Sequence, residues 1–157
     1  MSVVGLFIAC GIWTETPPIS EAEPAPVEVP VPKTDVVVFF DRNGALEPVP
    51  RKVNEKFVYR ATVQNLFEGP TPEETARGLV FHASGATGFS KFRLKDGAAE
   101  LTLQGACDAG GLAITLASHV RQTLLQFPDI RSVRIFDADG ETTDPTDLNS
   151  APRCLTP

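Results

Sequence analysis

The sequence lacks two features that would point to a membrane-spanning or a nucleic-acid-binding protein. It contains no stretch of about 18 apolar residues, the length that a membrane-spanning helix needs, so we expect no such helix. Lysine and arginine together number 14 against 20 aspartate and glutamate residues, which gives a net charge of −6. Because an acidic surface repels phosphate backbones, we expect no nucleic-acid partner.

Histidine is also scarce, which limits acid–base chemistry. The two histidines are His82 and His119. The spacing of His119 from Leu116 places it at the border of the apolar face of a helix, so we expect it to flank that helix rather than act as a base. His82 closely precedes Ser84, but no Gly-x-Ser-x-Gly turn surrounds that serine. We therefore expect no catalytic residue, no cofactor and no enzymatic activity.

Metal ligands do not occur in a familiar spacing either. Asp137-Ala138-Asp139-Gly140 resembles the start of a calcium loop, but its glycine comes two positions too early. The sequence therefore predicts an acidic, solvated turn there and no metal site.

Residues 15–33 carry six prolines and four glutamates. Proline removes a backbone donor, and this stretch has few large apolar groups to bury, so it cannot join a folded core. We divide the chain into a shortened signal segment (1–10), a flexible tether rich in proline and glutamate (11–33) and one folded domain with a C-terminal tail (34–157).

Cys10 is a candidate site of lipid attachment. Leu6-Phe7-Ile8-Ala9-Cys10-Gly11 resembles a bacterial lipobox, in which a small residue precedes the lipidated cysteine. No basic residue precedes the apolar run, and the run is short for a signal-peptide core. The alternative is an ordinary apolar N-terminus that happens to hold a cysteine. The tether favours the lipoprotein interpretation, because an anchored domain needs a spacer.

The folded part alternates strands and helices. The patterns predict a central strand at 35–40, an edge segment or loop at 46–53, a helix at 55–68, a hairpin of 90–94 with 99–103, a second helix at 112–127 and a last strand at 130–137. The hairpin is apolar on one face only, and each helix needs one face covered. The predicted fold class is α+β, a two-layer sandwich with two principal helices on one face of a mainly antiparallel sheet.

Several motifs occur in an order that resembles one family. A helix that ends in Glu-Gly-Pro is followed by Thr-Pro-Glu-Glu and Gly-Leu. Five pieces in all resemble the GerMN domain of bacterial envelope proteins, first known from spore germination and sporulation: Val36–Phe40, Leu46–Arg51, Leu66–Leu79, Asp96–Gly97 and Gln126–Val133.

The resemblance implies a non-enzymatic binding or assembly module of the cell envelope, outside the cytoplasm and here anchored to the membrane by lipid. It implies an envelope protein as partner, and we expect the contact in the exposed region from Gly69 to Gly88, with Glu73, Glu74 and Thr87 as candidate binding residues. The alternative is a module that binds peptidoglycan.

The cysteine count fits this location. If Cys10 carries lipid, Cys107 and Cys154 remain as an even number, which favours a disulfide that ties the tail to the domain. Such a bond would indicate an oxidising compartment. Two buried free thiols, or a reactive pair, are the alternatives.

Overall fold

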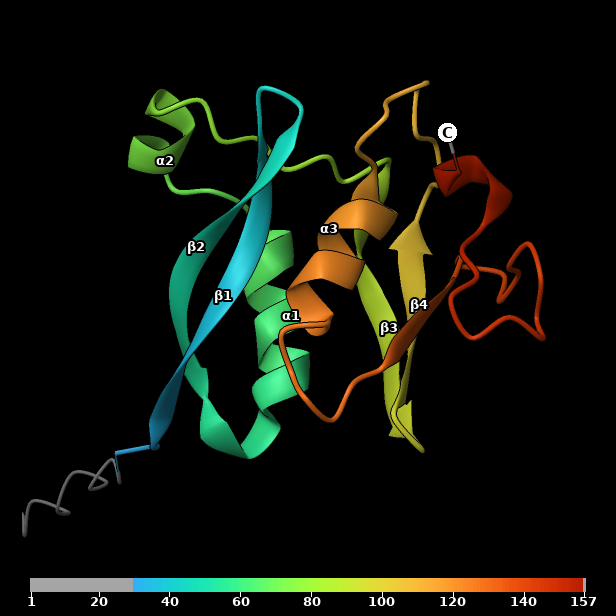
Figure 1. Cartoon of the computed structure of the whole chain (residues 1–157). Helices are drawn as coiled ribbons and strands as arrows, with labels where there is room; N and C mark the ends of the chain where they lie inside the picture. The colour runs from blue at the N-terminus through green and yellow to red at the C-terminus, as the bar shows by residue number, and fades with distance from the viewer. Residues whose placement is uncertain (1–29, 157) are drawn as a thin grey trace, which may run out of the picture. The chain divides into compact units, whose positions relative to one another are not determined.

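The computed structural model describes residues 30–156 (Figure 1). Cys10 and nearly all of the predicted tether lie outside the described residues. The elements, in chain order, are β1 (Lys33–Arg42), β2 (Ala45–Asn54), η1 (Glu55–Phe57), α1 (Val58–Glu68), α2 (Pro72–Ala76), β3 (Ala86–Lys95), β4 (Ala98–Gly105), α3 (Leu116–Leu124), β5 (Ser132–Phe136) and η2 (Arg153–Leu155).

β1 and β2 form a two-stranded antiparallel ribbon. Its turn at Asn43-Gly44 has positive φ angles of 55° and 84°, which suit an Asn-Gly hairpin. β2 is an edge strand in which Pro48 and Pro50 occupy exposed positions, as the sequence allowed. The expectation that residues 35–40 form a central strand is wrong, because among the described residues these pair with β2 alone.

The outer edge of β1 is covered by side chains instead of a strand. The Gln126 side-chain amide accepts from Val37 N at 2.9 Å and donates to Val37 O at 2.7 Å. Phe39 N donates to Thr123 Oγ1 at 3.1 Å, and His119 Nδ1 lies 2.8 Å from Phe39 O. Polar groups on and just after α3 thus satisfy the backbone groups that a neighbouring strand would otherwise pair.

β3, β4 and β5 form the second sheet, in that order. β3 and β4 are the predicted hairpin, turning at Asp96-Gly97. β4 and β5 run parallel, since α3 carries the chain back across the sheet between them. β3 begins at Ala86, before the predicted start of the hairpin at residue 90.

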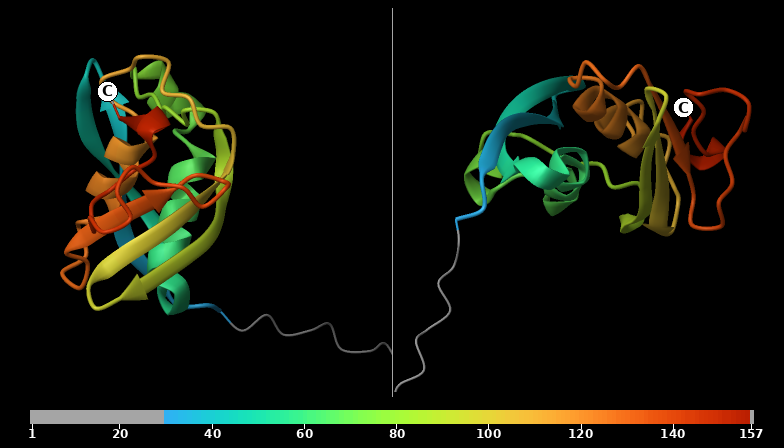
Figure 2. Two further views of the ribbon diagram at one scale, coloured as in Figure 1. Left: turned by 90° about the vertical axis from the view of Figure 1, so that its right-hand side faces the viewer. Right: turned by 90° about the horizontal axis from the view of Figure 1, so that it is seen from below.

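α1 and α3 lie between the two sheets and contact both (Figures 1 and 2). The α+β class is confirmed, and two of the three strand pairs are antiparallel. The strands divide between two sheets instead of forming the single sheet that the sequence suggested. α3 is shorter than the predicted helix over 112–127 at both ends: it starts only after its cap at Thr115, and residues 125–127 form a turn and a bend beyond its end at Leu124.

The core lies where the helices meet the inward faces of both sheets. Its largest fully buried side chains include Phe40, Leu66, Leu101, Leu116, Leu124 and Ile135. Within residues 30–156, no helix has the length and apolar character needed to cross a membrane.

Candidate functional site

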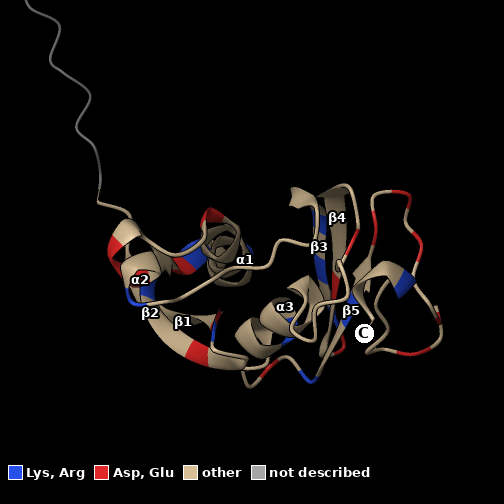
Figure 3. Cartoon of the chain, turned by 90° about the horizontal axis from the view of Figure 1, so that it is seen from above, with Lys and Arg blue, Asp and Glu red and all other residues tan. Residues whose placement is uncertain are grey.

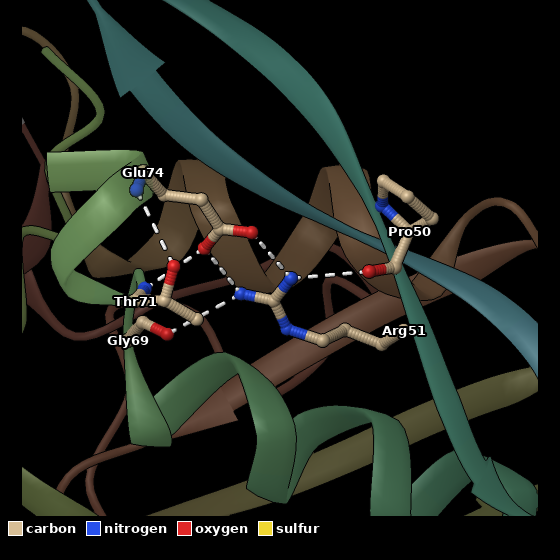
Figure 4. A network of polar contacts seen from close by, with 5 residues as sticks. All are labelled: Pro50, Arg51, Gly69, Thr71 and Glu74. Carbon is tan, nitrogen blue, oxygen red and sulfur yellow. Dashed lines mark hydrogen bonds and ion pairs between the residues drawn. The ribbon is translucent and has the colours of Figure 1, made fainter. Parts of the chain in front are cut away.

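Two of the family-like motifs, distant in sequence, meet in space (Figure 4). Arg51 extends from β2 toward the segment that joins α1 to α2. Its Nη1 and Nη2 atoms lie 2.8 and 2.7 Å from Glu74 Oε1 and Oε2, a two-pronged ion pair. Nη2 also lies 3.5 Å from Gly69 O. This Arg51–Glu74 brace fixes the α1–α2 connection against the β1–β2 ribbon.

The local sequence explains the shape of the braced segment. Gly69 has φ +78°, a conformation that lets the chain leave α1. Pro72 starts α2, and Thr71 caps it: Glu74 N donates to Thr71 Oγ1 at 3.3 Å, while Thr71 N donates to Glu74 Oε2 at 2.8 Å. One carboxylate therefore serves both the cap and the brace.

The surroundings favour the charged form of Glu74. The hydrogen bond from Arg51 lowers the pKa of Glu74 to about 2, outweighing the opposite effect of burial. Its side chain is only 10% exposed and that of Arg51 15%. The Arg51 guanidinium also lies 5.6 Å from the centre of the Phe40 ring, which joins the brace to the core.

These contacts change the expectation for the three candidate binding residues. Glu74 is buried and its oxygens are used inside the domain, so its surroundings indicate a structural role rather than a binding one. Glu73 is exposed on α2. Thr87 is exposed on β3, where it lines a hollow beside α1.

Asp41, His82 and His119 form a polar cluster that sequence reasoning missed. His82 Nε2 lies 2.8 Å from Asp41 Oδ2, and His82 N donates to His119 Nε2 at 3.3 Å. A backbone bridge between Asp41 and Val80 brings the two segments together. No local pattern signals this contact, because it joins the end of β1 to a loop and to α3.

His119 is not the flanking residue that its sequence position suggested, since it is fully buried. Its Nδ1 faces the Phe39 carbonyl and its Nε2 accepts from His82 N, so the ring is neutral with its hydrogen on Nδ1. Burial lowers the pKa of His119. Burial raises the pKa of Asp41, but the hydrogen bonds from His82 and Gly44 N lower it overall.

The Ser84 side chain hydrogen-bonds to the start of α3 and not to His82. Its hydroxyl oxygen accepts from Leu116 N at 3.2 Å, at the start of α3. Among the described residues, no hydrogen bond joins the Ser84 hydroxyl to His82.

A comparison with known families decides the identity of the domain. The family described as "Germane: Sporulation and spore germination" matches residues 36–144, more than half of the chain. The chain belongs to this family. The resemblance indicated by the sequence motifs is thereby confirmed, and the Arg51–Glu74 brace lies within the matched Germane domain.

A solved structure shares the fold of this Germane domain. The tandem GerMN domains of the sporulation protein GerM from Bacillus subtilis match with a TM-score of 0.51 and 20% identity, over 80% of this chain and 48% of that one. The chain thus spans about half of that structure. A candidate lipoprotein from Clostridium perfringens matches at a TM-score of 0.41 and 18% identity, over 67% of this chain and 74% of that one. None of the curated proteins matches the chain significantly.

The chain beyond the Germane match folds back onto the domain. Cys107 and Cys154 form a disulfide with a Cα–Cα distance of 5.7 Å. Ala109 N donates to Cys154 O at 3.0 Å, and Thr115 Oγ1 donates to Leu155 O at 2.9 Å. Leu155 is buried in the core, so the tail is part of the packed structure.

The acidic segment of the Germane domain is a closed turn. Asp137 Oδ1 accepts from the backbone N–H groups of Asp139 and Glu141 at 3.0 and 2.8 Å. Within residues 30–156, no three histidine, cysteine, aspartate or glutamate side chains are grouped closely enough to hold a metal ion.

Proposed function

We propose that this protein is a lipoprotein of the cell envelope, anchored through Cys10 and carrying a non-enzymatic Germane domain that binds a protein partner. Membership of the sporulation and germination family supports the assembly role. The lipobox-like sequence at Cys10 and the tether that follows support the anchor. The Cys107–Cys154 disulfide supports an oxidising location outside the cytoplasm.

The observation that carries the binding role is the braced α1–α2 segment. The Arg51–Glu74 brace and the Thr71 cap fix the shape of the segment (Figure 4), and Glu73 and Arg77 on the same segment are exposed. A segment whose shape is set before binding loses less conformational entropy when a partner docks. A rigid, charged protrusion of this kind suits recognition of a folded protein.

A specific feature favours peptidoglycan as the second candidate ligand. Phe57 is 57% exposed at the end of η1, directly before α1. It lines a hollow of about 390 Å³ together with Asn54, Arg60 and Gln64. An aromatic face beside amide and guanidinium groups can stack on a sugar and hydrogen-bond its hydroxyls.

A crosslinked pull-down from solubilised envelopes tests the binding role. The full chain is compared with Glu73→Lys and with Glu141→Lys, a matched charge reversal on the exposed turn after β5. We expect a reproducible protein partner whose recovery falls with Glu73→Lys alone. Equal recovery with both variants would exclude the α2 face. Recovery of wall fragments alone, abolished by Phe57→Ala, would replace the proposal with a wall-binding module.

Fractionation of cells tests the anchor separately. The full chain is expected in the membrane fraction and to enter the detergent phase, because a diacylglycerol group partitions into lipid. Cys10→Ser is expected to release it. Continued membrane association of Cys10→Ser would disprove lipid anchoring through this cysteine.

A further inference from the structure

The outer edge of β3 is not paired with any strand within residues 30–156. Lys95 and Ala98 flank the two-residue turn of the hairpin, and Arg93 faces Glu100 two positions further on. In such a hairpin these residues exchange hydrogen bonds with the neighbouring strand. The backbone groups of Phe92 and Leu94 consequently point away from β4, toward the open edge.

A groove runs along this edge, with α1 as its other wall. A hollow of about 350 Å³ lies between α1 and β3 and is lined by Arg60, Phe67, Thr87 and Phe89. A second hollow, of about 520 Å³, extends from Arg60 and residues 90–93 of β3 across the outer face of the sheet to Glu100, Thr102 and Phe136. Figure 3 shows α1 beside β3. We name this the β3 groove. A strand edge facing a helix is the arrangement in which several peptide-binding domains accept an extended peptide.

Aromatic side chains line the β3 groove. Phe67 of α1 and Phe89 of β3 have ring centres 5.9 Å apart, and the Arg60 guanidinium lies 4.8 Å from the centre of the Phe89 ring. Further along, the rings of Tyr59 and Phe92 stack at 6.4 Å. Alternate side chains of an added strand would therefore meet apolar rings, while its backbone meets the edge of β3.

The exposed cations of the β3 groove indicate the charge of the segment that it would bind. Arg60, Lys91 and Arg93 are exposed, and none of them forms an ion pair with a residue in the described range 30–156. Glu68 lies at the opposite end, and Glu100, which lines the hollow at the Arg93 end, is paired with Arg134. The groove is thus locally basic at its Arg93 end, on a chain whose net charge is −6. An incoming segment with acidic residues at that end is complementary.

The same charges disfavour pairing between two copies of this chain. If two β3 edges met, Lys91, Arg93 and Lys95 of one copy would face a second set of cations. Charged residues, lysine above all, are a common means of preventing self-association of strand edges. The cations along β3 therefore disfavour pairing with a second copy of the chain and favour pairing with an acidic strand.

We propose that the β3 groove binds an extended acidic segment of a protein partner, which joins the sheet as a fourth strand beside β3. This inference rests on the proposed function, because it names the form in which a protein partner is recognised. The partner contributes backbone hydrogen bonds at Phe92 and Leu94 and carboxylates toward Arg60, Lys91 and Arg93.

Selection from a random-peptide phage library against the full chain tests the inference. We expect the selected peptides to be acidic with alternating apolar residues. A synthetic selected peptide is then titrated against the full chain, Lys91→Glu/Arg93→Glu and the control Lys33→Glu, an exposed charge reversal on β1. We expect about tenfold weaker binding for the double variant alone. The amides of Phe92 and Leu94 should become protected from hydrogen exchange when peptide binds.

Three results would overturn the inference: selected peptides without acidic residues, equal binding by the double variant, or unprotected Phe92 and Leu94 amides. Protection of those amides by dimerisation without peptide would assign the edge to a second copy instead. A result that refutes the β3 groove can be distinguished from one that refutes the proposed function. If the envelope partner is still captured through the Glu73 face, only the groove is refuted; if no partner is captured at all, the proposed function fails.

Discussion

At the scale of single residues, Arg51 and Glu74 lie 23 positions apart and form a nearly buried ion pair. Removing one partner leaves the other charge buried without compensation, which typically costs about 3 kcal/mol or more. We predict that Glu74→Gln lowers the free energy of unfolding by about this amount, measured by urea denaturation. The matched Glu73→Gln change, at an exposed site, should stay within about 0.5 kcal/mol of the parent. Equal effects of the two changes would contradict the structural role of the brace.

The same carboxylate predicts a loss of stability in acid. The pKa of Glu74 is about 2 in the folded chain against an ordinary value of 4.5, so the unfolded chain binds the proton more readily. The contribution of Glu74 is present above about pH 4.5 and is lost as pH falls toward 2. Urea midpoints measured across this window should decline more steeply in the parent than in Glu74→Gln. Parallel curves would count against the assignment.

His119 adds a second dependence at milder pH. Its pKa in the folded chain lies below the ordinary value of 6.5, because burial opposes the charged ring. The unfolded chain therefore binds more protons, and stability should fall as pH drops below about 6.5. His82 donates its backbone N–H to the ring, and the His82 side chain contacts Asp41. His119→Gln should remove this decline in unfolding experiments, whereas an unchanged decline would show that another group causes it.

Sequence alone identifies some of these residues but not their roles. Glu74 stands out because it follows Pro72 in a family-like motif, and an acid near a helix start is readily expected. Its partner Arg51 belongs to another motif, and only the folded chain brings the two together. The helical spacing places His119 at the border of the apolar face of α3. That position is the same whether the side chain contacts water or β1, so the spacing could not reveal that His119 is buried.

At the scale of elements, α3 completes the edge of β1 through side chains. Gln126 both accepts from and donates to the backbone of Val37. We predict that Gln126→Ala destabilises the domain by about 1–2 kcal/mol, because buried backbone groups lose their partners. Hydrogen exchange at the Val37 amide should accelerate. Gln122→Ala, an exposed change on the same helix, is the control and should affect neither quantity.

The elements themselves are largely predictable, and the exceptions have physical causes. The β3–β4 hairpin and α1 follow from alternation, helical spacing and capping residues. β1 was wrongly expected to be central because it is apolar on both faces. Its second face and outer edge meet α3, and a covering helix leaves the same apolar pattern as a neighbouring strand. The start of α3 at Leu116 depends on the Thr115 cap rather than on the apolar repeat.

At the scale of the whole molecule, the disulfide holds the tail across α3 and β5. It joins residues 47 positions apart. The chain-entropy model gives about 4 kcal/mol for a loop of this length. We predict that reduction, or the Cys107→Ser/Cys154→Ser double change, lowers the free energy of unfolding by about that amount. Reductant should have no further effect on the double variant. An unchanged midpoint after verified reduction would contradict the prediction.

The α+β class was predictable because one-sided strands and helices leave few ways to bury their apolar faces. The division into two sheets was not, since local patterns do not say which strands pair. The parallel pairing of β4 with β5 depends on α3 acting as a crossover, which is a property of the folded topology. The β3 groove likewise exists only because α1 and β3 meet in space.

The disulfide also makes residues 107–154 a covalent ring. The exposed acidic stretch 138–149 lies within that ring, so a protease that cuts there opens a loop without separating two pieces. The tail would stay joined to the domain through sulfur while Leu155 remains in the core. A protein nicked at this exposed stretch would thus persist as a single, covalently joined molecule.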